Sequence, residues 1–311
     1  MKKKIILFTL VAFIFIYVLL QIIPYGKNKI TNAFRIETGS RPLVIAHGGA
    51  KLMNPENTWM AYDYAYELGV DVLEMDLQIT KDNQLVTYHN NELEDMSNTA
   101  GLVSEHNYVD LKKYNFGENF TDLQGYQPYK NLSLEERESF GDSLTPANLE
   151  EMFQKYGKDV LYICELKNYG DLGQKSAQKI LDLIQQYNME EYVCVASFDQ
   201  DTLNYFISIA PDNIITSFDM GTATNFIIAN YVGYGFFLNY PQAGFQIPMD
   251  KFGIPLATDY LVYKIHHNNM FVHYWTINDV EDMEKCIQLN ADGIITDRPD
   301  LLIQLLHDLG Y

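Results

Sequence analysis

The chain has 311 residues, of which 47% are hydrophobic, and its 22 Lys and Arg against 41 Asp and Glu give a formal net charge of −19. This length and composition predict a folded body with a large core, and they exclude a disordered chain or a small disulfide-stapled scaffold. The acidic balance argues against a nucleic-acid-binding surface, and an anionic substrate would need a cation or a few well-placed basic side chains.

The amino-terminal segment predicts a membrane anchor. Residues 5–23 form an apolar run interrupted by only two polar residues, close to the ~20 residues that a helix needs to cross a bilayer. No small-x-small cleavage pattern follows, which favours an uncleaved signal anchor. Three lysines at positions 2–4 favour a single-pass protein of the cell membrane with its body on the extracytoplasmic side. We therefore expect a cytoplasmic tip, transmembrane segment and linker in residues 1–35 and one folded domain in residues 36–311.

From Arg41 onward, short apolar runs alternate with helical patterns, which is typical of an α/β domain. This alternation continues almost to the end of the chain. It fits a TIM (β/α)₈ barrel of ~250 residues better than the alternative, a smaller open doubly wound sheet. The nine strand-like runs are residues 43–47, 72–79, 84–89, 160–166, 192–198, 214–218, 236–239, 270–277 and 293–297.

Helical patterns lie between most of these runs. Residues 61–68 repeat apolar side chains on one face and end at Gly69, and similar helices are expected in residues 280–287 and 301–306. Three widely spaced cysteines in apolar stretches predict buried free thiols and no disulfide framework: Cys164, Cys194 and Cys286.

Two stretches break the alternation. Only four residues separate the runs at 72–79 and 84–89, too few for a crossover helix, so a hairpin is expected there. Residues 105–145 contain no clear strand but several aromatic residues. An insertion of this size and composition predicts a lid or a substrate-binding cap.

Charged side chains collect where the predicted strands end. In the sequence LEMDL at 73–77, strand alternation places Glu74 and Asp76 together on the inward face. Two such carboxylates repel each other unless one is protonated or a cation bridges them, and hard divalent cations prefer oxygen ligands. Glu165 and Lys167 share the same face of another strand.

Two histidines add to this pattern. His47 and His89 end the first and third runs, where a barrel places its catalytic groups, and Glu56 lies in the loop after the first run. Each charged residue alone is explained by capping or a salt bridge. Their coincidence at successive strand ends favours a metal-dependent site.

An ordered set of motifs resembles the glycerophosphodiester phosphodiesterase family. No single block is specific, but the set follows the family's order over residues 42–305. The matching stretches are VIAHGG at 44–49, PENT at 55–58, EMDL at 74–77, TKD at 80–82, VTYH at 86–89, ELK at 165–167, SF at 197–198, WTIN at 275–278 and GIITDRP at 293–299.

The resemblance implies a barrel of the phospholipase-C-like phosphodiesterase type. Such an enzyme cleaves glycerophosphodiesters to glycerol phosphate and an alcohol with a divalent cation, Ca²⁺, Mg²⁺ or Mn²⁺. The implied metal ligands are Glu74, Asp76 and Glu165, with Glu56 nearby as a ligand or polar support. The implied catalytic residues are His47 and His89, which share the acid–base chemistry, and Lys167, which offsets phosphoryl charge. Trp275 is a candidate for stacking on the substrate.

Two positions depart from the family pattern. Gly48 stands where the family usually has Arg after the first His, and Asn90 stands where it usually has Asp after the second. Loss of the Arg removes a fork-shaped phosphate donor. The backbone amides of Gly48 and its neighbour, or the side chain of Lys51 or Arg298, are the candidates to replace it.

Three readings of function follow. The first is a membrane-anchored phosphodiesterase acting on small, lipid-derived or polymeric glycerol phosphate diesters. The second is a non-catalytic, membrane-tethered module that binds phosphodiesters, which the missing Arg favours and the two retained histidines oppose. The third is a related lysophospholipase D or phospholipase-C-like enzyme. The leaving alcohol, the cation and the oligomeric state do not follow from the sequence.

Overall fold

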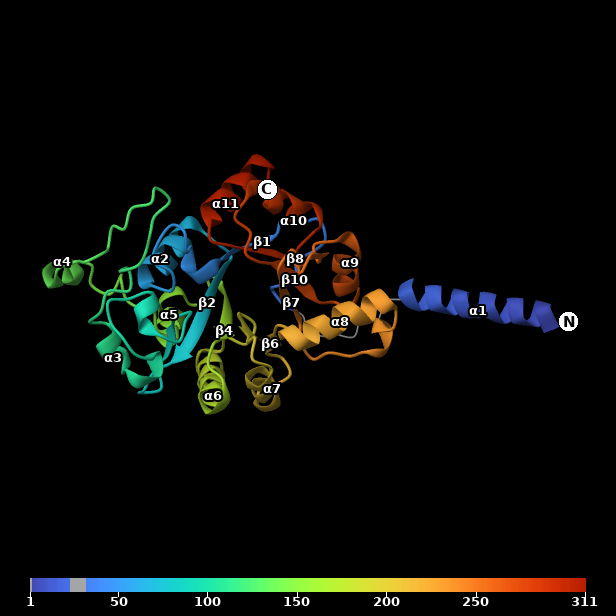
Figure 1. Ribbon diagram of the computed structural model, residues 1–311, viewed down its shortest axis with the longest axis horizontal. Helices are drawn as coiled ribbons and strands as arrows, with labels where there is room; N and C mark the ends of the chain where they lie inside the picture. The colour runs from blue at the N-terminus through green and yellow to red at the C-terminus, as the bar shows by residue number, and fades with distance from the viewer. Residues whose placement is uncertain (1, 23–31) are drawn as a thin grey trace.

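The computed structural model describes residues 2–22 and 32–311 (Figure 1). The amino-terminal helix α1 (Lys2–Ile22) projects away from the body and is long and apolar enough to cross a membrane. A cleavable signal sequence would have the same length and composition. Residue 23 of the predicted run and the linker at 24–31, with its lysines at 27 and 29, lie outside the described residues.

A parallel barrel forms the body. Within the described residues the hydrogen-bonded order is β6-β5-β4-β2-β1-β11-β10-β7, and a parallel bridge from Ser217 to Gly244 joins the two ends. The Phe218 N–H donates to the Gly244 carbonyl over 3.0 Å at this seam. The (β/α)₈ expectation is confirmed over the open sheet. The strands are β1 (Leu43–Ala46), β2 (Val72–Ile79), β4 (Leu161–Leu166), β5 (Val193–Ala196), β6 (Ile215–Thr216), β7 (Gly244–Ile247), β10 (Phe271–Tyr274) and β11 (Gly293–Thr296).

The short strand β3 (Leu85–Thr87) lies outside the barrel. It pairs antiparallel with β2, which confirms the predicted hairpin. A second hairpin joins β8 (Asp250–Lys251) to β9 (Ile254–Pro255).

One predicted strand is wrong. Residues 236–239 overlap the 3-10 helix η4 (Gly235–Phe237), and the seventh barrel strand is β7, further along the chain. The β7 sequence GFQI has no apolar alternation because its inward positions are Gly and Gln. A side chain at Gly244 would clash with the ring of Phe271 at 2.3 Å, and Gln246 lines the cavity at the carboxyl end of the strands. Packing at the first inward position and the cavity at the second therefore require residues that give no apolar alternation in the sequence.

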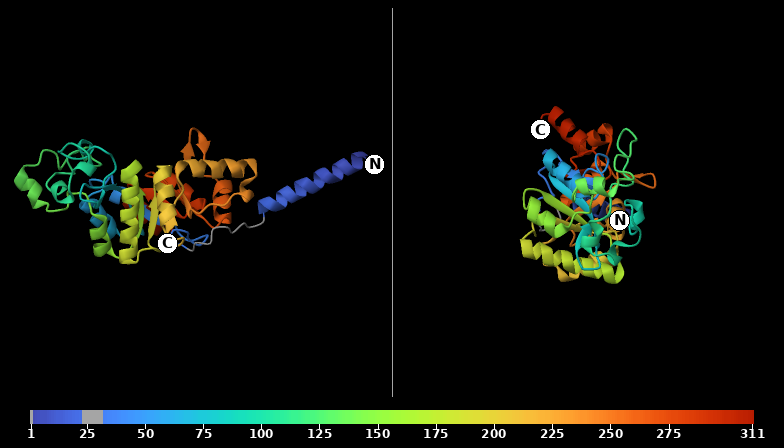
Figure 2. Two further views of the ribbon diagram at one scale, coloured as in Figure 1. Left: turned by 90° about the horizontal axis from the view of Figure 1, so that it is seen from below. Right: turned by 90° about the vertical axis from the view of Figure 1, so that its left-hand side faces the viewer.

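Helices surround the barrel and cover the outward faces of the strands (Figure 2). Helix α2 begins after the cap Thr58, whose hydroxyl accepts from the Ala61 N–H, and ends at the left-handed Gly69, as predicted. The three cysteines are free and buried. The helices of this layer are α2 (Trp59–Leu68), α5 (Leu149–Tyr156), α6 (Gly170–Tyr187), α7 (Gln200–Ile209), α8 (Met220–Val232), α9 (Asp259–His267), α10 (Val280–Gln288) and α11 (Pro299–Asp308).

The barrel interior has two different ends. The amino ends of the strands enclose an apolar layer, into which Phe34 inserts from the segment that precedes β1. The carboxyl ends hold the polar residues of the predicted site. The inner apolar cluster comprises Phe34, Ile45, Val72, Ile163, Cys194, Ile215, Ala243, Phe271 and Ile295.

The segment 105–145, all of which the structure describes, contains no strand, as expected. It carries the short helices α3 (Tyr108–Leu111) and α4 (Leu134–Ser139), preceded by η2 (Leu93–Asp95) and η3 (Val103–Glu105). Phe116 and Leu111 pack with residues of β3 in a small core of their own. The segment lies at the end of the body opposite α1 (Figure 2).

Candidate active site

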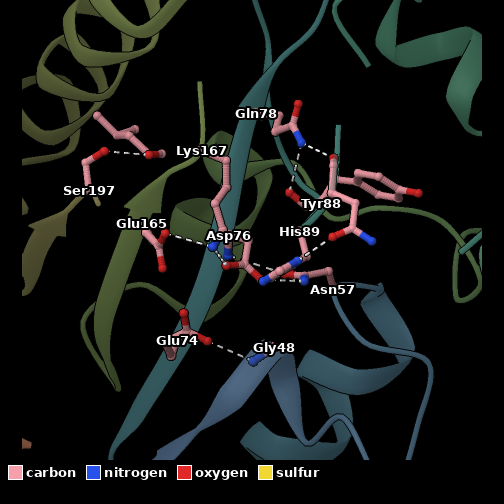
Figure 3. A network of polar contacts seen from close by, with 12 residues as sticks. Gly48, Asn57, Glu74, Asp76, Gln78, Tyr88, His89, Glu165, Lys167 and Ser197 are labelled. Atoms are coloured by element: carbon pink, nitrogen blue, oxygen red, sulfur yellow. Dashed lines mark hydrogen bonds and ion pairs between the residues drawn. The ribbon is translucent and has the colours of Figure 1, made fainter. Parts of the chain in front are cut away.

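A cavity of about 260 Å³ opens at the carboxyl ends of the barrel strands. It brings together most of the predicted site residues, which come from the ends of different strands. The close-up shows several of these side chains converging from β2 and its neighbours (Figure 3). The cavity is lined by His47, Glu74, Asp76, His89, Glu165, Lys167, Ala196, Ser197, Phe198, Ser217, Phe218, Gln246, Trp275, Thr276 and Ile295.

Three carboxylates form the floor of the site. One oxygen from each of Glu74, Asp76 and Glu165 lies within 4.8 Å of the others, because Asp76 and Glu165 are register partners on adjacent strands. Burial and the charge of Asp76 raise the pKa of Glu74 well above its usual range, although the Gly48 N–H donates to it over 2.9 Å. Burial also raises the pKa of Glu165. So much buried negative charge fits a divalent cation, whose positive charge would offset it.

Lys167 forms ion pairs with two of the three carboxylates. Its Nζ lies 3.0 Å from Asp76 Oδ1 and 2.7 Å from Glu165 Oε1. Burial lowers the pKa of Lys167, but the two carboxylates outweigh that effect and raise it above the usual range. Burial raises the pKa of Asp76, yet Lys167 and the amide of Asn57, which donates over 2.9 Å, help bring it below its usual range. Because the ammonium group of Lys167 pairs with Asp76 and Glu165, the negative charge of Glu74 is the least compensated of the three.

His47 is held by a carboxylate that sequence reasoning did not assign to the site. Its Nδ1 lies 2.6 Å from Asp297 Oδ1, and Asn278 donates to the other oxygen of Asp297 over 2.8 Å. Burial lowers the pKa of His47, but the hydrogen bond to Asp297 and the nearby carboxylates outweigh this and raise the pKa to about 9. The two residues meet because β11 pairs with β1, which brings the ends of these strands together.

His89 has a neutral partner instead. Its Nδ1 lies 2.7 Å from Oδ1 of Asn90, so the residue that departs from the family pattern still makes the contact that orients the ring. The backbone carbonyl of Asn90 in turn accepts a hydrogen bond from the amide of Gln78. Asn90 therefore orients the imidazole through a neutral amide oxygen, where an Asp would supply a carboxylate.

The candidates to replace the missing Arg differ in position. The Gly48 N–H is already bonded to Glu74, and Arg298 forms an ion pair with Asp300 at 2.7 Å. Lys51 lies 2.7 Å from Glu56. Burial lowers the pKa of Lys51, but the charges of Glu56, Asp297 and Asp76 outweigh this effect and raise it. Lys51 therefore lies close enough to interact electrostatically with the carboxylates of the site.

Glu56 does not join the three-carboxylate group. Instead it lines a neighbouring cavity with Lys51 and the aromatic side chains Phe116 and Phe120 of the insertion. Trp275 does line the main cavity, where its ring lies 6.1 Å from that of Phe198 in an edge-on arrangement.

Gln246 is a cavity residue that the sequence reasoning missed. Among the described residues, its buried Nε2 has no hydrogen-bond partner. A buried amide without a partner costs free energy unless a ligand satisfies it. The assignment of the seventh strand to residues 236–239 concealed its inward position.

Two imidazoles with hydrogen-bonded partners lie beside a buried acidic group at the carboxyl ends of the strands, where barrel enzymes hold their catalytic residues. The fold and the site therefore have the layout of an enzyme built on a (β/α)₈ barrel.

Comparison with known proteins agrees with this class. The family model described as "Glycerophosphoryl diester phosphodiesterase family" matches residues 47–301. A glycerophosphodiester phosphodiesterase of Caldanaerobacter subterraneus subsp. tengcongensis is 31% identical, covering 87% of this chain and 100% of its own length. A lysophospholipase D of Rattus norvegicus is 23% identical and covers 86% of each chain. The chain belongs to the glycerophosphoryl diester phosphodiesterase family, and it is an enzyme that hydrolyses glycerophosphodiesters.

Solved structures confirm the fold. A putative glycerophosphoryl diester phosphodiesterase of Silicibacter pomeroyi superposes with a TM-score of 0.68 at 22% identity, covering 89% of this chain and 96% of the other. A phosphodiesterase of Oleispira antarctica, solved with the product sn-glycerol-3-phosphate, superposes with a TM-score of 0.65 at 19% identity, covering 86% and 97%.

Proposed function

We propose that the protein is a cation-dependent phosphodiesterase that releases glycerol phosphate and an alcohol at a membrane surface. The observation that carries the cation dependence is the buried group of three carboxylates, of which Lys167 compensates only two. Glu74, Asp76 and Glu165 would hold the ion, and their oxygen donors suit Ca²⁺, Mg²⁺ or Mn²⁺. When bound, the ion would supply positive charge beside the phosphoryl oxygens.

The two histidines would carry the proton transfers. A free hydroxyl of the glycerol moiety attacks phosphorus, one P–O bond forms, and the P–O bond to the leaving alcohol breaks. One histidine accepts the proton of the attacking hydroxyl and the other donates a proton to the leaving oxygen. Water then opens the cyclic phosphate with the transfers reversed, so that both imidazoles return to their starting states. Lys167 would offset charge on the phosphoryl oxygens.

Lys51 would supply the phosphate contact that Gly48 cannot make. Lys51 lines the neighbouring cavity, and the effect of Asp297 and Asp76 on its pKa supports a position close to the site. Lys51→Ala should then raise KM about tenfold, the effect of losing one charge-assisted contact of roughly 1.4 kcal/mol. Arg298→Ala is the matched control, because Arg298 pairs with Asp300 and, unlike Lys51, lines neither of the two cavities.

The substrate class follows from the membrane helix and the aromatic cavity. If α1 anchors the chain in the cell membrane, with the barrel on the extracytoplasmic side, the site faces lipid-derived or polymeric glycerol phosphate diesters. The similarity to a lysophospholipase D supports lipid-derived substrates. Trp275 and Phe198 offer apolar surface beside the site for a ligand to pack on.

Release of glycerol phosphate from glycerophosphocholine by the full chain in detergent tests the proposal. The protein is first treated with a chelator, and Ca²⁺, Mg²⁺ or Mn²⁺ is then added back. Glu74→Gln and His47→Ala should each lower the rate ~10²-fold or more. The exposed Glu191→Gln is the control and should leave it unchanged. Release that survives chelation would contradict the cation requirement.

A further inference from the structure

A stretch of 30 residues in this acidic chain has no charge. Residues 220–249 contain no Asp, Glu, Lys, Arg or His, whereas 20% of the whole chain is charged. The stretch comprises α8, the turn that contains η4, and β7. Burial of β7 explains the end of the stretch, but α8 lies outside the barrel, where a helix facing water normally carries charged side chains.

Much of the apolar surface of this stretch is exposed. We call the following seven side chains, each between 40% and 76% exposed, the α8 face: Ile228, Tyr231, Val232, Tyr234, Phe237, Tyr260 and Tyr263. The last two belong to α9, which lies beside α8. The rings of Tyr231 and Tyr260 are 5.2 Å apart, and the Tyr260 hydroxyl donates to the Asn230 carbonyl over 2.7 Å. The two helices therefore present one continuous surface.

The α8 face adjoins the point where α1 meets the body (Figure 1). Gln21 donates to the Gly233 carbonyl over 3.1 Å, and Lys264 donates to Gln21 Oε1 over 2.8 Å. Gly233 has a φ of +92°, and a side chain there would clash with the ring of Tyr17. These contacts fix the last turn of α1 against the junction of α8 and α9.

If α1 crosses a bilayer, this junction sets the level of the membrane relative to the body. The apolar window of α1 runs from Lys4 to Gln21, so the helix leaves the hydrocarbon at the turn that touches Gly233. The α8 face then lies at the depth of the lipid headgroups. Tyr, which supplies four of the seven side chains of the face, prefers this zone, because it accommodates an apolar ring and a polar hydroxyl together.

We propose that the α8 face docks on the bilayer that α1 crosses, and so seats the barrel against the membrane. The occupant is a lipid surface rather than a second copy of the chain, because the face is continuous with the membrane helix and lacks charge throughout α8 and the turn after it. The inference rests on the proposed anchoring role of α1. It does not depend on the catalytic chemistry.

The full chain in phosphatidylcholine vesicles provides the test. Phe237→Cys and Tyr126→Cys each add one reactive thiol, because the native cysteines are buried, and both positions are at least 70% exposed. Tyr126 lies in the insertion at the far end of the body. A polarity-sensitive fluorophore at position 237 should emit at shorter wavelength and be quenched by lipids with a spin label near the headgroup. The same fluorophore at position 126 should instead be quenched by iodide in water.

The possible outcomes distinguish failure of the docking proposal for the α8 face from failure of the anchoring role of α1. Equal quenching by iodide at both positions, in protein that stays with the vesicles after alkaline washing, would overturn the proposal and leave the anchor intact. Blue-shifted emission at 237 without quenching by spin-labelled lipid would mean that protein covers the face, which also overturns it. Loss of the chain from the vesicles would contradict the anchor. Matching thermal midpoints of the two variants and the parent exclude misfolding, and no readout uses hydrolysis.

Discussion

Two histidines inside the same barrel, one at each end of the strands, have opposite protonation behaviour. His47 lies at the carboxyl ends, and its pKa is raised to about 9. His273 lies fully buried at the amino ends, and burial lowers its pKa to about 4. Burial acts in the same direction on both rings. The difference comes from their neighbours, which at one end are several carboxylates and at the other are mostly apolar.

The surroundings of His273 are mainly apolar, and the residue contributes to packing inside the barrel. Its ring stacks 4.4 Å from that of Phe271, and its Nε2 donates to the Phe34 carbonyl over 3.1 Å. Among the described residues, its Nδ1 has no hydrogen-bond partner. The barrel thus keeps one imidazole neutral in an apolar layer and holds the other, with a raised pKa, among carboxylates at its carboxyl end. Four experiments test the difference between the two ends of the barrel.

Removing the carboxylate that holds His47 should have the largest effect. Asp297→Asn should lower kcat ~10²-fold with KM little changed, because the imidazole loses the charge that stabilises its protonated form but the substrate contacts remain. Steady-state kinetics on glycerophosphocholine measure this. Asp300→Asn, which alters a carboxylate of α11 outside the cavity, is the control, and an equal loss in both variants would contradict a positioning role.

The other histidine should affect stability instead of activity. Because the pKa of His273 is about 4 in the folded state and about 6.5 in the unfolded state, the unfolded chain binds more protons between these values. The stabilisation present above pH 6.5 is therefore lost as the pH falls to 4, by about 3 kcal/mol at most. Denaturant unfolding at several pH values should show this loss, and His273→Phe should flatten the curve. An unchanged curve in the variant would contradict the assignment.

A divalent cation should stabilise the folded protein by binding the carboxylates at the carboxyl ends of the barrel strands. At a concentration of 100 times its Kd, a bound ion adds about 2.7 kcal/mol to the free energy of unfolding. Glu74→Gln should abolish this gain, yet it should make the cation-free protein more stable, because a poorly compensated buried carboxyl is replaced by a neutral amide. Thermal melts with and without Ca²⁺ or Mn²⁺ measure both effects, and a variant that still gains stability from the ion would exclude Glu74 as a ligand.

The smallest effect is expected at Gln246. Gln246→Leu should raise KM about tenfold, because the substrate loses one hydrogen bond from an amide that has no other partner. The stability of the variant should not fall, since no bond within the described protein is removed. Stability lost without any change in KM would show that the amide serves the fold.

The sequence allowed the barrel and much of the site to be predicted, for a physical reason. Strand alternation is strong in β2, so the inward direction of Glu74 and Asp76 could be read from the order of residues alone. In β7 the inward residues are Gly244 and Gln246, which leave no apolar pattern, and the strand was placed at 236–239 instead. Because β7 was not recognised as a strand, the inward direction of Gln246 was not predicted either.

The partners of the histidines required three-dimensional information. Asp297 stands 250 positions after His47, and only closure of β11 against β1 brings them together. Asn90 looked like a departure from the family pattern, but its side chain still contacts the ring of His89. The absence of charge in residues 220–249 can be read from the sequence, but the exposure of the α8 face beside α1 can be seen only in the structure.

Arg137 has a consequence for how the insertion can change over evolution. The buried guanidinium donates to the carbonyls of Lys112, Tyr114 and Gly141, which lie on both arms of the segment. Shortening either arm would strand a buried cation, so partial deletions should be selected against. We therefore expect related chains to carry this segment whole or to lack it, with changes in length confined to its exposed loops.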